Sequence, residues 1–248
     1  MKTTVVIPAR LGSRRLPGKP LIQIAGRPLL WHVWSRVRCA RSVNEVVVAT
    51  EAEEIRAAVV SWGGRALMTP AACASGSERV ASVLEAVGGE LVVDVQADMP
   101  LIDPGLLDAL VAAWQQRPCD VLTPVYRITD HELLGNPNVV KVVRTEDGRA
   151  LYFSRSPVPH VRDVPMQRWP SRHDFWGHVG IYGFGRDVLA GYADLAPTGI
   201  EEAEKLEQLR FVAAGLTIDT FELNHCPVTV DTPADLARAR HLMGDDAV

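Results

Sequence analysis

Short, almost uniformly apolar segments recur along the chain and alternate with segments of helical periodicity. The first three apolar segments are residues 5–7, 46–49 and 91–95. Strands that are apolar on both faces are typical of parallel sheets that helices cover on both sides. Between these segments, apolar residues repeat at helical spacing over residues 29–37 and again after Ser77. This βαβα order predicts an α/β fold with a doubly wound, mostly parallel, Rossmann-like sheet.

The pattern changes in the middle of the chain. Residues 139–144 and 149–154, joined by a turn at Asp147-Gly148, predict a β-hairpin, and residues 157–174 are rich in Pro, Arg and His. We therefore predict one domain, residues 1–248, with an inserted β-rich flap or dimerisation element at about 136–178. The other expected elements are helices that begin at the caps Asp103-Pro104 and Thr232-Pro233, a helix at 201–214, and strands at 120–126, 178–184 and 216–223.

Composition excludes several classes of protein. Lys and Arg number 26 and Asp and Glu 30, so the formal net charge is −4 and no overall positive field favours nucleic acid. The apolar runs are far shorter than the roughly 20 residues of a membrane helix, and no separate apolar signal region precedes the first strand. The four cysteines lie far apart, which argues against a zinc site or a disulfide framework. We expect a cytoplasmic protein with neither nucleic-acid nor membrane partners.

A cation-rich segment, residues 8–20, follows the first predicted strand. It contains Gly12, Gly18, three arginines and Lys19. Glycines free backbone N–H groups and the cations neutralise phosphate charge, so the segment predicts a cradle for a polyphosphate. It is not the usual P-loop, because five residues rather than four separate the glycines and Pro20 replaces the hydroxyl residue that binds magnesium. The alternative is that the arginines form an ordinary solvated surface.

Two carboxylates are placed where α/β sheets bind ligands. Asp98 follows the third apolar strand, and Asp231 precedes the last helix. Ligands of open α/β sheets bind outside the carboxyl ends of the strands, so both residues are candidates to face one crevice and hold Mg²⁺. The alternatives are an Asx turn before Pro100 for Asp98 and an ordinary turn into a helix for Asp231.

Two further groups of residues are candidates for ligand binding. Ala74 to Arg79 form a small-residue turn that opens a helix with free N–H groups, although the turn also fits a simple helix cap. His178 and Tyr182 occupy alternate positions of one predicted strand, with Gly180 between them, so we expect all three to face the same way. The alternative is a half-buried strand with a satisfied histidine.

Several motifs carry a specific resemblance. The segment Pro-Ala-Arg-x-x-Ser-x-Arg-Leu-Pro-Gly-Lys-Pro-Leu at residues 8–21 resembles the N-terminal signature of sugar-acid cytidylyltransferases. The chain as a whole is similar to the 3-deoxy-manno-octulosonate cytidylyltransferase (CMP-Kdo synthetase) family, which has a nucleotidyltransferase fold. The further matching segments are residues 96–100, 136–141, 152–155, 178–183, 206–210 and 230–233.

The resemblance implies a reaction and a set of site residues. CMP would pass from CTP to the anomeric hydroxyl of an eight-carbon 3-deoxy-ulosonic acid, with release of pyrophosphate, for lipopolysaccharide precursor synthesis by a Mg²⁺-dependent homodimer. No dedicated general base is identified. The implied residues are Arg10, Arg15, Lys19 and Asp98 for catalysis; Ala9, Arg10, Ser13, Arg15, Lys19, Thr50, Ser75, Arg79 and Gln96 for the nucleotide; Arg155, His178, Tyr182, Glu207 and Gln208, with Arg162 as a further carboxylate donor, for the sugar; and Asp98 and Asp231 for the metal.

The chain departs from the family pattern beside one metal ligand. Where the family usually has Gln-Gly-Asp-Glu-Pro, this chain has Ala97 and Met99 around Asp98. Loss of a carboxylate there predicts an altered metal position or sugar preference, such as an amino- or deoxy-modified octulosonate. The other candidates are a nonulosonate (sialic-acid type) cytidylyltransferase, a sugar-phosphate nucleotidyltransferase, and a degenerate nucleotide-binding module without activity.

Overall fold

The chain is divided between two structural units in the computed structural model, which describes residues 1–13 and 15–245. The first unit comprises Met1–Ala112 and Pro227–Val248, and the second comprises Ala113–Cys226. The flap expected at about 136–178 lies wholly within the second unit. The organisation as one domain with an insertion stays a prediction.

Parallel strands form the sheet of the first unit. Their order is β5-β4-β1-β6, and every neighbouring pair is parallel. β1 is buried along its whole length, which explains why its sequence is apolar on both faces. The chain moves outward from β1 to β4 and β5 and then returns to β6 on the other side of β1, which is the doubly wound order that the sequence predicted. The bounds are β1 (Thr3–Ala9), β4 (Glu45–Thr50), β5 (Arg65–Met68) and β6 (Leu91–Val95).

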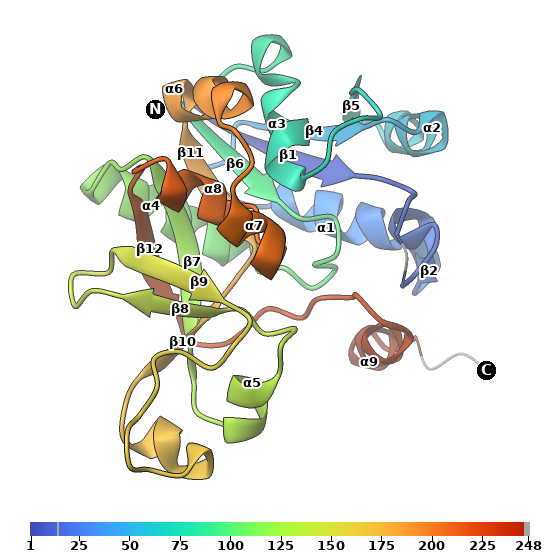
Figure 1. Cartoon of the computed structure of the whole chain (residues 1–248). Coiled ribbons are helices and arrows are strands. Elements are labelled where there is room, and N and C mark those ends of the chain that lie inside the picture. The colour runs from blue at the N-terminus through green and yellow to red at the C-terminus, as the bar shows by residue number, and fades with distance from the viewer. Residues whose placement is uncertain (14, 246–248) are drawn as a thin grey trace. The chain divides into compact units, whose positions relative to one another are not determined.

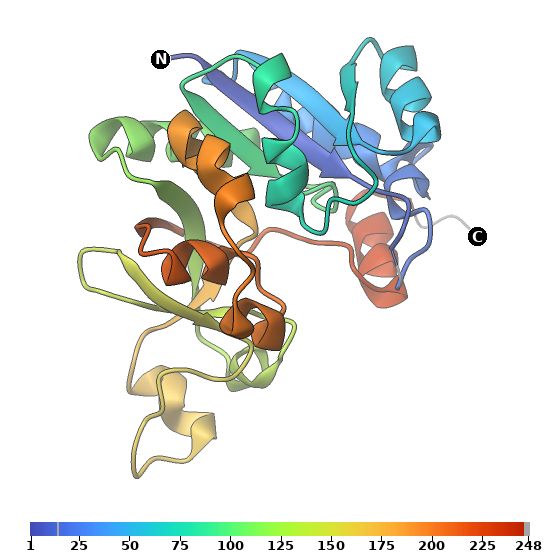
Figure 2. The same ribbon diagram turned by 45° about the horizontal axis from the view of Figure 1, so that its top comes forward.

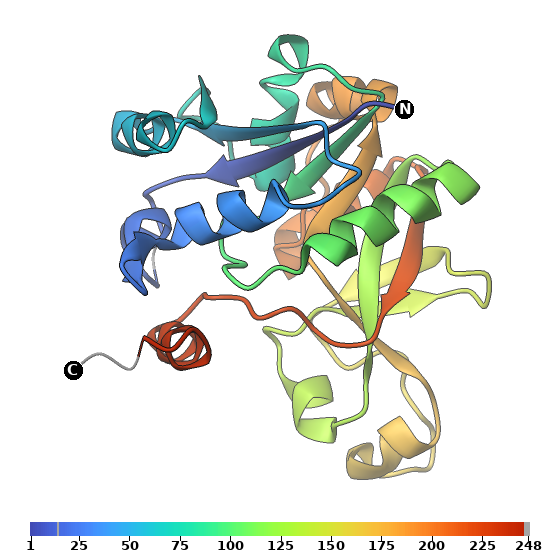
Figure 3. The same ribbon diagram turned by 180° about the vertical axis from the view of Figure 1, so that it is seen from behind.

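Helices cover both faces of this sheet. Helix α3 (Gly76–Ala81) lies in front of β1 and β6 in Figure 1. Helix α1 (Leu29–Val37) lies on the opposite face, as the view from behind in Figure 3 shows. It buries Leu30, Val33 and Val37, which recur at helical spacing. The predicted α/β fold is therefore confirmed. The other elements of this unit are η1 (Lys19–Leu21), β2 (Gln23–Ile24), β3 (Arg27–Pro28), α2 (Glu53–Ser61), η2 (Leu84–Ala86) and α9 (Pro233–Leu242); α4 (Pro104–Gln116) runs across the boundary between the units.

The helix expected after Ser77 differs from the prediction. It begins at Gly76, with Ser75 as its N-cap, and it ends at Ala81 before the separate 3-10 turn η2. The Ser82 hydroxyl donates to the Arg79 carbonyl at 2.8 Å. Such a bond from a serine hydroxyl to the backbone competes with helical hydrogen bonds. The helix therefore ends here, although the apolar periodicity of the sequence continues.

The second unit is built around β7. Strand β12 pairs with it in parallel along six residues, while β10 and β11 pair with it antiparallel at its two ends. β8 and β9 form the predicted hairpin, with Gly148 at a φ of +92° in its turn. Figure 2 shows this hairpin in yellow-green. The bounds are β7 (Val121–Ile128), β8 (Lys141–Arg144), β9 (Ala150–Ser154), β10 (Phe175–His178), β11 (Ile181–Gly185) and β12 (Ile218–Leu223).

The single strand predicted at 178–184 is wrong in one respect, because it is interrupted. β10 ends at His178 and β11 begins at Ile181. His178 pairs with Val125 and Gly183 pairs with Leu122, so five steps along this segment match three steps along β7. The two extra residues form a bulge, closed where the Ile181 N–H donates to the Val179 carbonyl at 2.7 Å. Alternation alone therefore does not set the directions of His178 and Tyr182.

The helix predicted at 201–214 is also interrupted. It consists of α7 (Gly199–Glu204) and α8 (Gln208–Ala213), separated by Lys205 in the left-handed conformation with φ 54°. The Arg155 side chain donates hydrogen bonds to the Glu204 and Lys205 carbonyls at 2.7 and 3.3 Å. These bonds satisfy carbonyls at the end of α7 that have no partner within the helix.

The predicted flap region has its own small apolar cluster. Trp169 is buried within η3 and stacks on Phe175.

The four cysteines are free thiols. Within residues 1–13 and 15–245, no helix is long and apolar enough to span a membrane. The remaining elements of this unit are α5 (His131–Gly135), η3 (Met166–Ser171), α6 (Arg186–Ala190) and η4 (Gly191–Asp194).

Candidate functional site

Lys19 joins two carboxylates in the first unit. Its Nζ lies 2.9 Å from Asp98 Oδ2 and 3.0 Å from Asp231 Oδ1. Arg15 approaches the other oxygen of Asp231 at 3.2 Å. The sequence predicted each of these four residues separately, and the structure brings them together. We refer to Arg15, Lys19, Asp98 and Asp231 as the Lys19 cluster.

The loop before Lys19 is folded tightly enough to aim its side chain. The N–H groups of Ser13 and Gly18 both donate to the Leu11 carbonyl, at 2.8 and 3.2 Å. Gly18 has a φ of +67°, a conformation that L side chains rarely adopt. Leu16 is buried and anchors the loop. The glycine of the cradle motif thus serves the turn that directs Lys19.

Backbone contacts hold the two carboxylates. The Val230 N–H donates to the Asp98 carbonyl at 2.9 Å, which ties the segment before α9 to the loop after β6. Thr232 caps α9 in a capping box with Asp235. Asp231 therefore leads into a helix, as its alternative interpretation supposed, and its carboxylate still faces Lys19.

Electrostatics keep the Lys19 ammonium charged. Its burial works against the charged form, but the Asp98 and Asp231 carboxylates together outweigh burial and raise the pKa of Lys19. Burial raises the pKa of Asp98, and Asp231 adds to this while Lys19 opposes it. The Asp98 carboxylate therefore depends on a nearby cation, whether lysine or metal, to stay ionised.

The expected nucleotide contacts gather at strand ends of the first unit. Ala9 and Thr50 are register partners at the ends of β1 and β4. Gln96 follows β6 and donates to Asp94 Oδ1 at 2.8 Å. Arg10 is exposed, and the Ser13 hydroxyl accepts from the Leu16 N–H at 3.3 Å. This end of the sheet is where doubly wound folds bind ligands, so these residues stay candidates for nucleotide contacts.

Ser75 and Arg79 have structural partners. The Ser75 hydroxyl accepts from the Glu78 N–H at 3.1 Å as a helix cap. Arg79 is 3% exposed, and its guanidinium forms an ion pair with Glu51 at 2.6 Å and bonds the Thr69 hydroxyl. A direct nucleotide contact by Arg79 would have to coexist with these bonds, so its predicted role stays a prediction.

The donor set of the Lys19 cluster fits a magnesium ion that is shared with a nucleotide. Asp98 and Asp231 offer hard oxygen ligands, and Mg²⁺ is commonly held by one or two carboxylates plus substrate phosphates. Among the described residues, no group of three or more His, Cys, Asp or Glu side chains forms a metal site of its own. The cluster therefore fits a metal that enters together with phosphate oxygens.

The second unit holds a separate group of the predicted sugar contacts. The His178 ring lies 5.4 Å from the Tyr182 ring, and the Tyr182 hydroxyl donates to Gln208 Oε1 at 3.2 Å. Gln208 is 2% exposed, and its Nε2 has no hydrogen-bond partner among the described residues. Burial lowers the pKa of His178 to about 3, so its ring is neutral at physiological pH. Glu207 is the N-cap residue of α8, next to Gln208.

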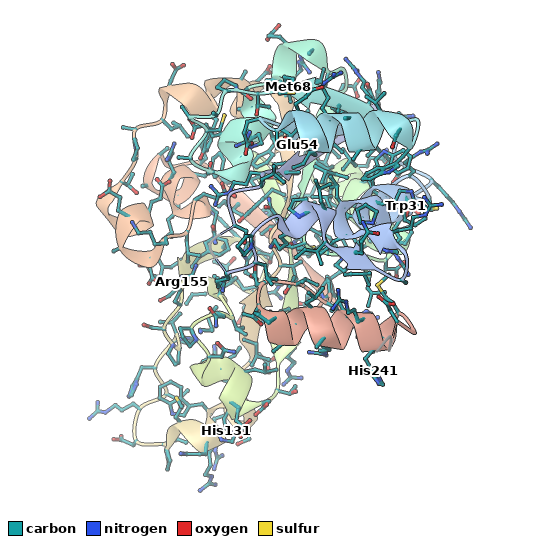
Figure 4. The ribbon with its side chains drawn as sticks, turned by 90° about the vertical axis from the view of Figure 1, so that its right-hand side faces the viewer. Trp31, Glu54, Met68, His131, Arg155 and His241 are labelled. Atoms are coloured by element: carbon teal, nitrogen blue, oxygen red, sulfur yellow. The ribbon has the colours of Figure 1, made fainter. Side chains whose placement is uncertain are left out.

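Arg155 differs from its expected use as a bidentate carboxylate donor. Its three side-chain nitrogens donate to the carbonyls of Glu204, Lys205 and Pro137. Figure 4 labels this residue, which follows β9. The arginine holds the break before α8, and therefore Gln208, in place. Arg162 is 90% exposed on the flap, paired with Asp163. Sugar contacts by either arginine stay predictions.

Three partners of these residues were not predicted. Thr123 bonds His178, Glu204 bonds the Ser154 hydroxyl and the Arg155 N–H at 2.6 and 2.9 Å, and Lys141 is fully buried. The Lys141 ammonium donates to three backbone carbonyls. Lys141 could have been identified from the sequence, because it ends the Asn-Pro-Asn-Val-Val-Lys segment at the start of a strand. Thr123 could not, because a threonine in an apolar strand does not indicate a functional residue.

Known proteins resemble this chain over most of its length. A family model described as cytidylyltransferase matches residues 4–218. A 3-deoxy-manno-octulosonate cytidylyltransferase of Myxococcus xanthus is 46% identical over 247 residues, covering 98% of this chain and 96% of its own. A protein of the same name from Escherichia coli is 41% identical, covering 99% and 97%. A solved structure of CMP:2-keto-3-deoxy-manno-octonic acid synthetase complexed with CTP matches with a TM-score of 0.92 at 40% identity, covering 100% of both chains.

Proposed function

This chain belongs to the 3-deoxy-manno-octulosonate cytidylyltransferase family, and from that membership and the Lys19 cluster we propose its reaction. It transfers CMP from CTP to the anomeric hydroxyl of a 3-deoxy-manno-octulosonate and releases pyrophosphate. The resemblance identified from the sequence motifs is thereby confirmed at the level of the family. The observation that carries the proposal is Lys19, held between two carboxylates at the ligand-binding end of a doubly wound sheet.

The cationic side chains of the first unit supply charge stabilisation. In-line attack by the sugar hydroxyl on the α-phosphorus develops negative charge on the α-phosphate and on the departing pyrophosphate. Lys19, Arg15 and Arg10 are the cations that would neutralise it. Lys19 is pre-positioned by its two carboxylates, so little reorganisation is needed when phosphate replaces one of them as its partner.

Asp98 and Asp231 would hold Mg²⁺. When bound, the ion would polarise the phosphate oxygens and orient the attacking hydroxyl. The chain's own task at this point is to hold the two carboxylates close together. Asp98 is fixed by its backbone bond to Val230 and Asp231 by the cap of α9, so the pair is preorganised for a divalent cation.

The side chains of the second unit would recognise the sugar acid. The neutral His178 ring and the Gln208 Nε2, which has no partner within the described part of the chain, offer uncharged hydrogen-bonding groups, which suit the hydroxyl groups of a polyol. Tyr182 orients the Gln208 amide. Cytoplasmic location, homodimer formation and a role in lipopolysaccharide precursor synthesis belong to the same proposal.

A modified octulosonate is the second candidate substrate. Met99 is 2% exposed and Ala97 is 7% exposed, so both side chains pack into the interior and add no charge beside Asp98. Any acceptor would meet a less acidic surrounding here than in relatives with a carboxylate at this position, and that difference changes the electrostatic basis of the acceptor preference. The assay below therefore compares 3-deoxy-manno-octulosonate with its 8-amino analogue.

Pyrophosphate release tests the proposal. Purified protein receives Mg²⁺ and one of the four nucleoside triphosphates, with 3-deoxy-manno-octulosonate, its 8-amino analogue or N-acetylneuraminate as acceptor. We expect release with CTP and an octulosonate, and far less with the other nucleotides or with N-acetylneuraminate. Binding of CTP without release from any acceptor would overturn the reaction and leave only a nucleotide-binding module.

A further inference from the structure

The buried hydroxyl of Thr123 has three hydrogen-bonding neighbours but only one proton to donate. Its Oγ1 lies 2.8 Å from the Ile181 carbonyl, 3.1 Å from the Val179 carbonyl and 3.0 Å from His178 Nε2. The residue is fully buried in β7, facing the bulge between β10 and β11. A threonine hydroxyl can donate one hydrogen bond and accept two. Which neighbour receives the proton determines what the histidine nitrogen must do.

The two carbonyls determine the direction of the bond between Thr123 and His178. Both carbonyls can only accept, and the Val179 carbonyl already accepts from the Ile181 N–H at 2.7 Å. If Thr123 donated to His178, its oxygen lone pairs would face two carbonyl oxygens within 3.1 Å without a proton between them. If Thr123 donates to Ile181, His178 Nε2 must carry a hydrogen and donate to Thr123.

The rest of the ring follows from this assignment. A neutral imidazole with hydrogen on Nε2 has an unprotonated Nδ1, which can only accept. Burial keeps the pKa of His178 near 3, so a second proton does not bind to Nδ1 at neutral pH. Phe153 lies edge-on at 5.2 Å and Tyr182 at 5.4 Å, and both restrict the ring.

We propose that Thr123 is a positioning residue that holds His178 in the Nε2–H tautomer, so that Nδ1 presents an acceptor to a hydroxyl group of the sugar acid. The part concerning the sugar rests on the proposed function, while the tautomer does not. The group facing Nδ1 must carry a hydrogen, as a hydroxyl or an amine does. An acceptor-only group, such as fluorine or a carbonyl oxygen, is excluded there because two lone pairs would meet.

The tautomer is tested on the full-length protein without substrate. Two-dimensional ¹⁵N–¹H spectra of histidine-labelled protein report which ring nitrogen carries hydrogen, and loss of one spin system in His178→Asn identifies it among the seven histidines. We expect a protonated Nε2 and an unprotonated Nδ1 in the wild type and in Thr123→Ser. We expect a mixture of tautomers in Thr123→Val. A protonated Nδ1 in the wild type would overturn the proposal.

Kinetics test the part that concerns the sugar. Thr123→Val is expected to raise the KM for the octulosonate by about tenfold, the effect of one hydrogen bond, while the KM for CTP stays unchanged. Thr123→Ser is expected to restore the wild-type value, which a purely steric role of the threonine methyl would not allow. Equal KM values in all three proteins would refute the positioning role.

Fluorinated acceptors identify the hydroxyl. In this series each sugar hydroxyl is replaced in turn by fluorine. One fluorinated sugar should bind the wild type more weakly than the unmodified sugar does. The same replacement should cause little further loss of affinity in Thr123→Val, because that variant has already weakened the same hydrogen bond. Losses that add fully for every member would overturn the contact with Nδ1. Failure of the reaction itself would appear as no turnover with the unmodified sugar, while the spectra would still report the tautomer.

Discussion

The Lys19 ammonium lies 2.9 Å from the Asp98 carboxylate, although 79 residues separate them in the sequence. The sheet accounts for this proximity, because β1 and β6 are neighbours and both residues follow the carboxyl end of their strand. Burial raises the pKa of Asp98, and the Lys19 ammonium opposes this effect. We expect the same ammonium to bind the phosphate groups of the nucleotide.

Lys19→Ala is expected to lower kcat by about 100-fold or more, the usual effect of removing one preorganised charge-stabilising group. It should also lower the free energy of unfolding slightly, because Asp98 and Asp231 then repel each other. Lys2→Ala is the matched control, since Lys2 is exposed and pairs with Glu45 at 3.5 Å. Pyrophosphate release and urea unfolding measure the two effects. An unchanged kcat would remove Lys19 from the phosphate site.

Asp98→Asn is expected to raise the Mg²⁺ concentration at half-maximal rate by about tenfold or more, because an amide oxygen is a weaker ligand than a carboxylate. Asp103→Asn, which changes an exposed carboxylate that caps the following helix, is the control. A magnesium titration of pyrophosphate release at saturating CTP measures the difference. If the two variants show the same metal dependence as the wild type, Asp98 is only a turn residue.

His178 gives stability a specific pH dependence. Its pKa is about 3 in the folded chain and about 6.5 when unfolded, because burial disfavours the charged ring. Between these values the unfolded state binds more protons, so this residue makes unfolding free energy rise from pH 3 to 6.5 and is neutral in effect above that. Urea unfolding at pH 4.5, 5.5 and 6.5 should show a smaller slope for His178→Asn. Parallel curves for the two proteins would contradict the low pKa.

Lys141 is expected to be a residue of stability and not of catalysis. Its fully buried ammonium donates to the carbonyls of Asn136, Val139 and Arg155 at 2.9, 2.6 and 2.5 Å. Lys141→Met would leave these buried acceptors without a donor and lower the free energy of unfolding by about 2–4 kcal/mol. Lys205→Met, at an exposed position, is the control. Equal unfolding midpoints in urea would show that water replaces the ammonium without cost.

Local sequence patterns predicted what depends on local physics. The apolar runs identified β1, β4 and β6, and the proline after Asp103 marked the start of α4, because burial and capping act over a few residues. The breaks at Val179 and Lys205 were not predictable, since each depends on a partner from another element, Thr123 in one case and Arg155 in the other. The members of the Lys19 cluster were identifiable as candidates, but the lysine bridge between the carboxylates required the three-dimensional structure.

The break between α7 and α8 depends on the left-handed backbone of Lys205. Lys205 has a φ of 54°, where an L side chain is strained by roughly 1 kcal/mol and glycine is not. Lys205→Gly should therefore keep or raise the free energy of unfolding, by up to about 1 kcal/mol, although glycine also makes the unfolded chain more flexible. Lys205→Ala, which retains the strain and removes only the long side chain, is the control. The comparison also tests the site, because a relaxed break that still presents Gln208 should leave the KM for the sugar unchanged. Destabilisation by glycine greater than by alanine, measured in urea, would show that the left-handed conformation does not persist in solution.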